Sequence, residues 1–211
     1  MTKGLIFVEG HGENEAAINL ITRLWVYLEL DPTHFWTKAY RSSQLNTENG
    51  IKKACEFARA EGFEKLLILR DEDDNCPRQT APASAQWIIN AALQIPSALV
   101  LFHREYETLF LPCLPIIARA NPIGTHGDPL PWIAADTTFT GDFESIRGVK
   151  EWLSRRYPSG RKYKPRVDQL PMTRLIDFEV LTNSDLPCFG SLVRGLQFLS
   201  ANQGHSVYPG Q

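Results

Sequence analysis

The sequence predicts an α/β protein: a mostly parallel sheet flanked by helices, followed by a C-terminal helical and loop extension. Short, mostly apolar segments alternate with amphipathic helical segments through the first half of the 211-residue chain, as in repeated strand–helix–strand units. Apolar strands are typical of a parallel sheet covered on both faces. Four prolines precede Phe110, whereas nine lie between Pro112 and Pro187. That density predicts shorter elements joined by loops in the second half.

The first half supplies the predicted core elements. Apolar and aromatic content predicts strands at residues 4–8, 35–40, 65–69 and 98–102. Helices are predicted at residues 14–28, 47–61 and 82–93. In the first helix Ala17, Ile21 and Leu24 recur at helical spacing. Gly62 ends the second helix, and Pro82 lies in the first turn of the third.

The second half predicts fewer regular elements. Residues 112–143 read as a long irregular insertion, and helices are expected at 149–156 and 189–201. The polar tail at 204–211 is expected to be loosely held. We therefore expect residues 1–111 to form the α/β core. Residues 112–211 would form an insertion and an extension packed on that core, within a single structural domain.

Composition narrows the class of protein. No apolar run approaches the roughly 20 residues of a membrane helix, and the four cysteines form no CxxC pair. We therefore expect a cytoplasmic protein with reduced thiols and no membrane association. The 22 Lys and Arg against 24 Asp and Glu give a net charge of −2, which by itself indicates no strong preference for polyanions.

The acidic side chains are grouped at predicted strand ends. The first group follows the first strand, the second follows the strand at 65–69, and the third follows the strand at 98–102. The candidate metal ligands in these three groups are Glu9, Glu13, Asp71, Asp73, Asp74, Glu105 and Glu107. The carboxyl ends of parallel strands lie along one edge of a sheet. Carboxylates gathered there repel one another unless a cation neutralises them, and such oxygen ligands suit Mg²⁺ or Mn²⁺. Taken singly, each of these residues could equally be a solvated surface carboxylate or a helix-capping group.

A basic segment lies late in the chain, at residues 147–166. It carries eight basic residues with Glu151 as its one acidic residue, and Trp152, Tyr157 and Tyr163 are interleaved. Such a stretch can grip phosphates while aromatic rings stack on bases. The candidate nucleic-acid-binding residues are Arg155, Arg156, Arg161, Lys162 and Arg166. The alternative is a solubilising helix face and loop.

The acidic motifs resemble those of a known fold family. The matching pieces are Val8-Glu9-Gly10-x-x-Glu13, Arg70-Asp71-x-Asp73-Asp74-x-Cys76, Glu105-x-Glu107 and Tyr163-Lys164. They resemble the Toprim fold of topoisomerases, primases, recombination-mediator proteins and OLD-family nucleases. More closely, the chain resembles an uncharacterised bacterial Toprim-like family whose members are often encoded beside an ATPase and associated with anti-phage defence.

The resemblance implies a nuclease: Mg²⁺-dependent (or Mn²⁺-dependent) hydrolysis of phosphodiester bonds in DNA or RNA, with a possible ATPase partner. It implies Glu9, Asp71 and Asp73 as metal ligands, with Lys164 neutralising charge on the reacting phosphate. Glu13, Asp74, Glu105 and Glu107 would serve a second cation or orient its waters. Two alternatives remain open: a non-catalytic Toprim-like module of an ATPase complex, and a metal-dependent phosphoryl enzyme acting on a nucleotide.

Overall fold

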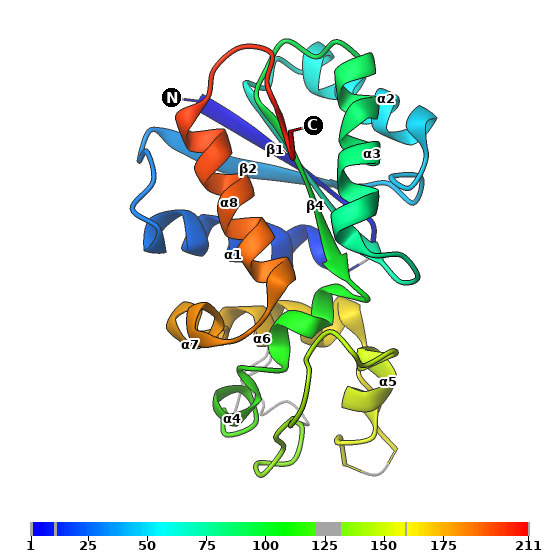
Figure 1. Cartoon of the computed structure of the whole chain (residues 1–211). Coiled ribbons are helices and arrows are strands. Elements are labelled where there is room, and N and C mark those ends of the chain that lie inside the picture. Colours follow the sequence, from blue (N-terminus) through cyan, green and yellow to red (C-terminus); the bar gives the residue numbers. More distant parts are fainter. Residues whose placement is uncertain (1, 11, 121–131, 159, 211) are drawn as a thin grey trace.

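The chain folds around a five-stranded parallel sheet with helices on both faces (Figure 1). The computed structural model describes residues 2–10, 12–120, 132–158 and 160–210. The strands are β1 (Thr2–Val8), β2 (His34–Arg41), β3 (Lys65–Glu72), β4 (Ser97–His103) and β5 (Val207–Tyr208), in the spatial order β2-β1-β3-β4-β5. Every adjacent pair is parallel. The prediction of an α/β protein with a parallel sheet and flanking helices is therefore confirmed, and the architecture is consistent with a Toprim-like fold.

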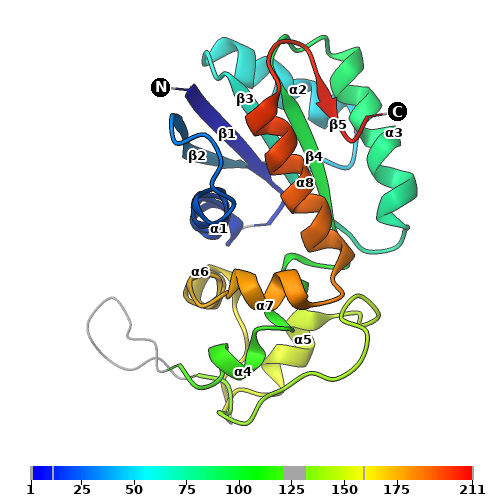
Figure 2. The same cartoon turned by 60° about the vertical axis from the view of Figure 1, so that its left-hand side comes forward.

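Alternation along the strands builds the two hydrophobic layers. Successive side chains of a strand point to opposite faces. In β1, Ile6 and Val8 pack with α1 (Glu13–Tyr27) and α8 (Pro187–Ala201). Leu5 and Phe7 pack instead with α2 (Glu48–Ala60) and α3 (Pro77–Asn90). Figure 2 shows α1 and α8 on one side of the sheet and α2 and α3 on the other. Because both faces are covered, the strands can be apolar along their whole length.

The bounds of two elements in the first half differ from the prediction, and both elements flank the acidic segment Asp71–Asp74. Helix α3 begins at Pro77, not at Pro82, which lies inside it. Pro77 takes the first helical position, where the missing N–H has no intrahelical partner to lose. Strand β3 continues past Leu69 to Glu72, and Asp71 aligns with Phe102 of β4. The acidic segment therefore starts inside the strand, where ladder pairing fixes its backbone.

A layer of short helices lies beyond the carboxyl ends of the strands (Figures 1 and 2). Its elements are η1 (Tyr106–Phe110), α4 (Leu114–Ile117), α5 (Val149–Ser154), η2 (Pro165–Gln169), α6 (Leu170–Arg174) and α7 (Phe178–Asn183). Of the predicted insertion at 112–143, residues 121–131 lie outside the described residues. The chain then returns through α8 along the sheet.

The C-terminal tail joins the sheet. Val207 and Tyr208 pair in parallel with Ser97 and Ala98 of β4. The prediction of a loosely held tail is wrong. The edge of β4 offers unpaired backbone groups, and β5 pairs with those at the beginning of β4. Gln211 lies outside the described residues. Within the part of the chain that the structure describes, every helix is too short or too polar to cross a membrane.

Candidate active site at the carboxyl edge of the sheet

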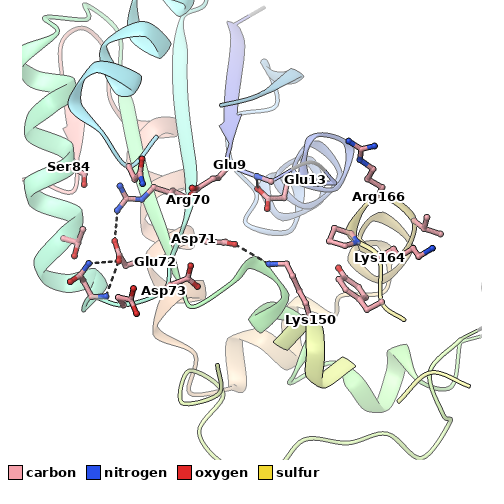
Figure 3. A pocket seen from close by; sticks show the side chains of 18 of the residues that line it. Glu9, Glu13, Arg70, Asp71, Glu72, Asp73, Ser84, Lys150, Lys164 and Arg166 are labelled. Atoms are coloured by element: carbon pink, nitrogen blue, oxygen red, sulfur yellow. Dashed lines mark hydrogen bonds and ion pairs between the residues drawn. The ribbon is translucent and has the colours of Figure 1, made fainter. Parts of the chain in front are cut away.

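A cavity of about 1060 Å³ opens where the carboxyl ends of β1 and β3 meet the helical layer. One wall carries the acidic residues that follow these two strands, including Glu9 and Asp71. The facing wall is formed by Lys150 of α5 and by the turn at residues 163–167. Figure 3 shows the acidic side chains on one side, with Lys150, Lys164 and Arg166 on the other. The fold therefore brings together segments that are far apart in the sequence.

Lys150 is the centre of a carboxylate cluster. Its Nζ lies 3.0 Å from Glu107 Oε2, 3.5 Å from Glu105 Oε1 and 3.7 Å from Asp71 Oδ2. The backbone N–H of Lys150 also donates to Glu105 Oε2 at 3.1 Å. Three of the predicted ligands thus converge, as expected, but the cation between them is an ammonium group of the protein.

Two carboxylates of this cluster, Asp71 and Glu107, are held by further donors. Asp71 Oδ1 accepts the backbone N–H of Tyr106 at 2.9 Å. Glu107 is completely buried, and its Oε1 accepts the Tyr163 hydroxyl at 2.8 Å and Gln169 Nε2 at 3.3 Å. Charge-assisted hydrogen bonds of this kind orient a carboxylate strongly. Glu107 is therefore fixed by η2 and by the chain before it, and it holds Lys150 in turn.

Burial and the mutual attraction of the charges set the pKa values of the four groups in this cluster. Burial raises the pKa of Asp71 well above its usual range, although Lys150 opposes this shift. Burial likewise raises the pKa of Glu105 and the pKa of Glu107. Burial alone would lower the pKa of Lys150, but Glu107, Asp71 and Glu105 raise it above its ordinary value. The geometry thus favours a charged lysine, because three carboxylates face one ammonium.

Glu9 and Glu13 form the neighbouring part of the acidic wall. Glu9 directly follows β1, and Glu13 begins α1. Glu13 is buried, and its Oε2 accepts the backbone N–H of Gly10 at 2.8 Å. Burial raises the pKa of both side chains. Both line the cavity, and the charge of Lys150 opposes the rise of both pKa values.

The rest of the acidic segment divides between the cavity and its rim. Asp73 is exposed and lines the cavity near Glu9. Asp74 lies at the exposed rim, where its Oδ1 accepts Arg147 Nη1 at 2.9 Å. Glu72 is buried and pairs with Arg70 at 2.7 Å. Asp73 is therefore placed with the inner carboxylates, whereas Asp74 is tied to the outer loop.

The basic segment is only partly directed at the cavity. Lys164 and Arg166 line it. Arg161 is paired with the buried Asp168 and lies over the Tyr157 ring. Arg156 lies 3.3 Å from the centre of the Trp152 ring and donates to the carbonyl of that residue at 3.0 Å. The other two candidates, Arg155 and Lys162, are exposed on the surface.

Lys150 is the main residue that sequence reasoning missed. In the sequence it is one of eight basic residues in the segment 147–166, and its spacing does not distinguish it from the others. Tyr163 belongs to a motif of the family resemblance, but its hydrogen bond to Glu107 depends on the packing of η2. No pattern in the sequence could have identified either contact, because both join segments more than 40 residues apart.

The acidic wall offers oxygen atoms of the kind that divalent cations prefer. Among the described residues, no group of three or more His, Cys, Asp and Glu side chains is arranged to hold a metal ion. The chemistry of the wall nevertheless suits Mg²⁺, since Glu9, Glu13, Asp71 and Asp73 offer hard oxygen donors around one cavity. A cation there would compete with Lys150 for Asp71.

Comparisons of the chain with protein-family models, curated proteins and solved structures find no match.

Proposed function

We propose that the protein is a cytoplasmic Toprim-like nuclease that hydrolyses phosphodiester bonds of nucleic acid with Mg²⁺ or Mn²⁺. The observation that carries this proposal is the cavity at the carboxyl edge of the sheet, where an acidic wall faces Lys150, Lys164 and Arg166. A substrate phosphate needs cations on one side and an activated water on the other. The family resemblance adds a role in anti-phage defence beside an ATPase partner.

In this proposal the acidic wall holds the metal. Glu9, Asp71 and Asp73 are the ligands, and Glu13 supports them from the start of α1. The bound ion would activate a water and stabilise charge on the leaving oxygen. The binding of a second cation by Asp74, Glu105 and Glu107 stays a prediction. Because Glu105 and Glu107 contact Lys150, the contacts support a different role for these two residues, which is to hold the ammonium group in place.

The three basic groups of the facing wall have separate parts. Lys150 is placed to neutralise charge on the reacting phosphate, because it lies within reach of Asp71 and on the cavity. Lys164 and Arg166 lie at the exposed edge of the same cavity and would hold the phosphate backbone. This division moves the charge-stabilising role predicted for Lys164 to Lys150, and it leaves Lys164 as a binding group.

The proposal is tested by metal-dependent cleavage of single-stranded DNA, duplex DNA and RNA. Asp71→Asn keeps the side-chain shape and an acceptor for the Tyr106 N–H, but it removes the charge. We expect it to lower the rate by about 100-fold or more, the size of effect seen when a key electrostatic group is removed. Asp136→Asn, at an exposed aspartate outside the cavity lining, is the matched control, with an expected loss of less than about threefold. Equal activity of wild type and Asp71→Asn, or no cleavage of any substrate, would overturn the proposal.

A nucleotide phosphoryl enzyme is the second candidate, and one observation favours it. Of the predicted nucleic-acid-binding residues, Arg166 lines the cavity, whereas Arg155 and Lys162 lie on the surface and Arg161 is paired internally. Replacing Arg155 and Lys162 by Gln separates the two functions. A nuclease should then bind a long strand more weakly and with a shallower salt dependence. A nucleotide enzyme should keep its full activity.

A further inference from the structure

We propose that the part of the cavity between β3 and α3 is a nucleobase subsite, which receives one unpaired base of the substrate. This inference rests on the proposed function, because it gives a binding site to the base whose phosphate would react at the acidic wall. The subsite is lined by Asn46, Arg70, Thr80, Ser84 and Trp87. Figure 3 shows Ser84 and Arg70 on the side of the cavity away from Lys164 and Arg166.

The size of the cavity is the first observation. Its volume of about 1060 Å³ exceeds what a phosphate and its cations occupy and lies just above the roughly 300–1,000 Å³ typical of small-molecule pockets. The acidic and basic walls account for its half next to α5 and η2. The half next to α3 carries side chains that the proposed hydrolysis does not use.

Two buried polar atoms point to a ligand in that half. Ser84 is 1 % exposed and Arg70 is 3 % exposed. Within the described part of the chain, neither Ser84 Oγ nor Arg70 Nε has a hydrogen-bond partner. Buried polar groups are nearly always paired, and both of these residues line the cavity. A ligand with its own donors and acceptors would satisfy them.

The charge around Arg70 selects a neutral ligand over an anion. Its Nη2 donates to Glu72 Oε2 at 2.7 Å and its Nη1 to the carbonyl of Leu45 at 3.2 Å. The guanidinium is therefore held rigidly with its charge compensated, and Nε is its one nitrogen without a hydrogen-bond partner among the described residues. Glu9 and Asp73 lie nearby, so a second phosphate would meet repulsion here.

The remaining lining residues fit a planar polar ring. Trp87 offers an aromatic surface, and bases stack on such surfaces whatever their identity. Asn46 supplies both a donor and an acceptor, as does the Ser84 hydroxyl. The edge of a nucleobase carries the same mixture of donors and acceptors. A base that occupies this subsite cannot be paired in a duplex, so the substrate would be single-stranded or would have one base turned out.

The inference is tested by isothermal titration calorimetry of the full chain with Mg²⁺ present. The four 5′-mononucleotides are compared with ribose 5-phosphate, which has the phosphate and sugar but no base. At least one mononucleotide is expected to bind about tenfold more tightly than ribose 5-phosphate, because stacking and hydrogen bonds to the base are added. Equal affinity for all five, or binding of none, would overturn the subsite.

Two variants assign the effect to these residues. Ser84→Ala should weaken mononucleotide binding about three- to tenfold, and Trp87→Leu about tenfold, while ribose 5-phosphate binding is unchanged. Because Ser84 Oγ has no partner among the described residues, Ser84→Ala should leave the melting temperature unchanged. Ser191→Ala on α8 is the control. Equal weakening of both ligands would contradict a base subsite.

The outcomes also separate this inference from the proposed function. Cleavage that depends on Asp71 but is unaffected by Ser84→Ala, Trp87→Leu and an abasic site at any position would overturn the subsite alone. Conversely, base-dependent binding through Ser84 with no effect of Asp71→Asn on cleavage would overturn the nuclease and keep the subsite.

Discussion

The ammonium group of Lys150 lies 3.0 Å from the carboxylate of Glu107, a side chain that is completely buried. The two residues belong to two neighbouring elements of the helical layer, and the pair joins α5 to η1, which follows β4. Removing one member of a buried ion pair leaves the other charge uncompensated. The stability of the acidic site should therefore depend on Lys150.

We predict that Lys150→Met lowers the free energy of unfolding by about 3 kcal/mol, at the lower end of the effect for broken buried pairs, because Lys150 keeps some contact with solvent. The double variant Lys150→Met/Glu107→Gln should recover part of this loss, because the Glu107 charge is removed together with its partner, whereas Asp71 and Glu105 still lack the ammonium group. Urea unfolding at neutral pH measures both. Lys52→Met, at a side chain that is 61 % exposed, is the control. A Lys150→Met variant as stable as this control would contradict the prediction.

Gly12, the residue before α1, lies closely against η2. A Cβ atom at Gly12 would lie 2.5 Å from the backbone carbonyl of Pro165 and 2.7 Å from Gln169 Oε1. We predict that Gly12→Ala displaces η2, which costs about 1–3 kcal/mol of stability through overpacking. It should also weaken phosphate binding, because Lys164 precedes this turn. Thermal melting and ligand titration measure the two effects.

The control for this change is Gly210→Ala, where a Cβ atom would meet open space. It should leave both stability and binding unchanged. If Gly12→Ala proves neutral in both measurements, the close approach of η2 to α1 is not needed for the site.

Lys65 stabilises the end of α8. It is 4 % exposed, and its Nζ donates to the carbonyls of Leu199 and Asn202. The last carbonyls of a helix have no partner within the helix. We predict that Lys65→Met costs about 1–3 kcal/mol, because buried acceptors lose their donor. Chemical denaturation measures the loss, and amide hydrogen exchange should locate it at the end of α8. Uniform exchange across the chain would argue against this local role.

Asp31 provides a pH-dependent test away from the site. Hydrogen bonds from the Thr33 backbone N–H at 2.9 Å and from the Thr33 hydroxyl at 2.8 Å lower the pKa of Asp31 below its usual value. A carboxyl group with a lowered folded pKa stabilises the fold fully above its unfolded pKa. That stabilisation is lost as the pH falls through the folded pKa.

The expected result is a pH-dependent difference between wild type and Asp31→Asn. The difference in the free energy of unfolding should be constant near neutral pH and should shrink as the solution becomes more acidic than the ordinary aspartate pKa of 3.8. Urea unfolding over a series of acidic buffers measures it. A difference that grows on acidification would reverse the sign of the argument.

The core of the fold was predictable because the residues of each core element themselves favour a strand or a helix. Runs such as Leu66 to Leu69 are apolar on both faces, and only a covered strand can bury both. The helix at 48–60 was predictable from its apolar face and from Gly62, whose positive φ of 69° suits the residue after a helix. The gathering of the acidic groups at one edge of the sheet was also predictable, since the carboxyl ends of parallel strands meet there.

The failures have nonlocal causes. Both Pro77 and Pro82 are compatible with a first helical turn, and the local sequence does not decide that the helix begins at Pro77. The tail at Val207 and Tyr208 has no local preference strong enough to predict a strand. It becomes one because the edge of β4 is within reach.

The sequence by itself determined the class of fold and the grouping of the carboxylates after strands, because the hydrophobic periodicity that defines strands and helices is set within a few residues. Tertiary structure alone decided which cation faces those carboxylates. Lys150 reaches Asp71, Glu105 and Glu107 only after α5 packs against η1 beyond the carboxyl ends of the strands, whereas Arg161 is paired with Asp168 instead. Such pairings join residues far apart in the chain. Their energy depends on distance and burial, which local sequence does not encode.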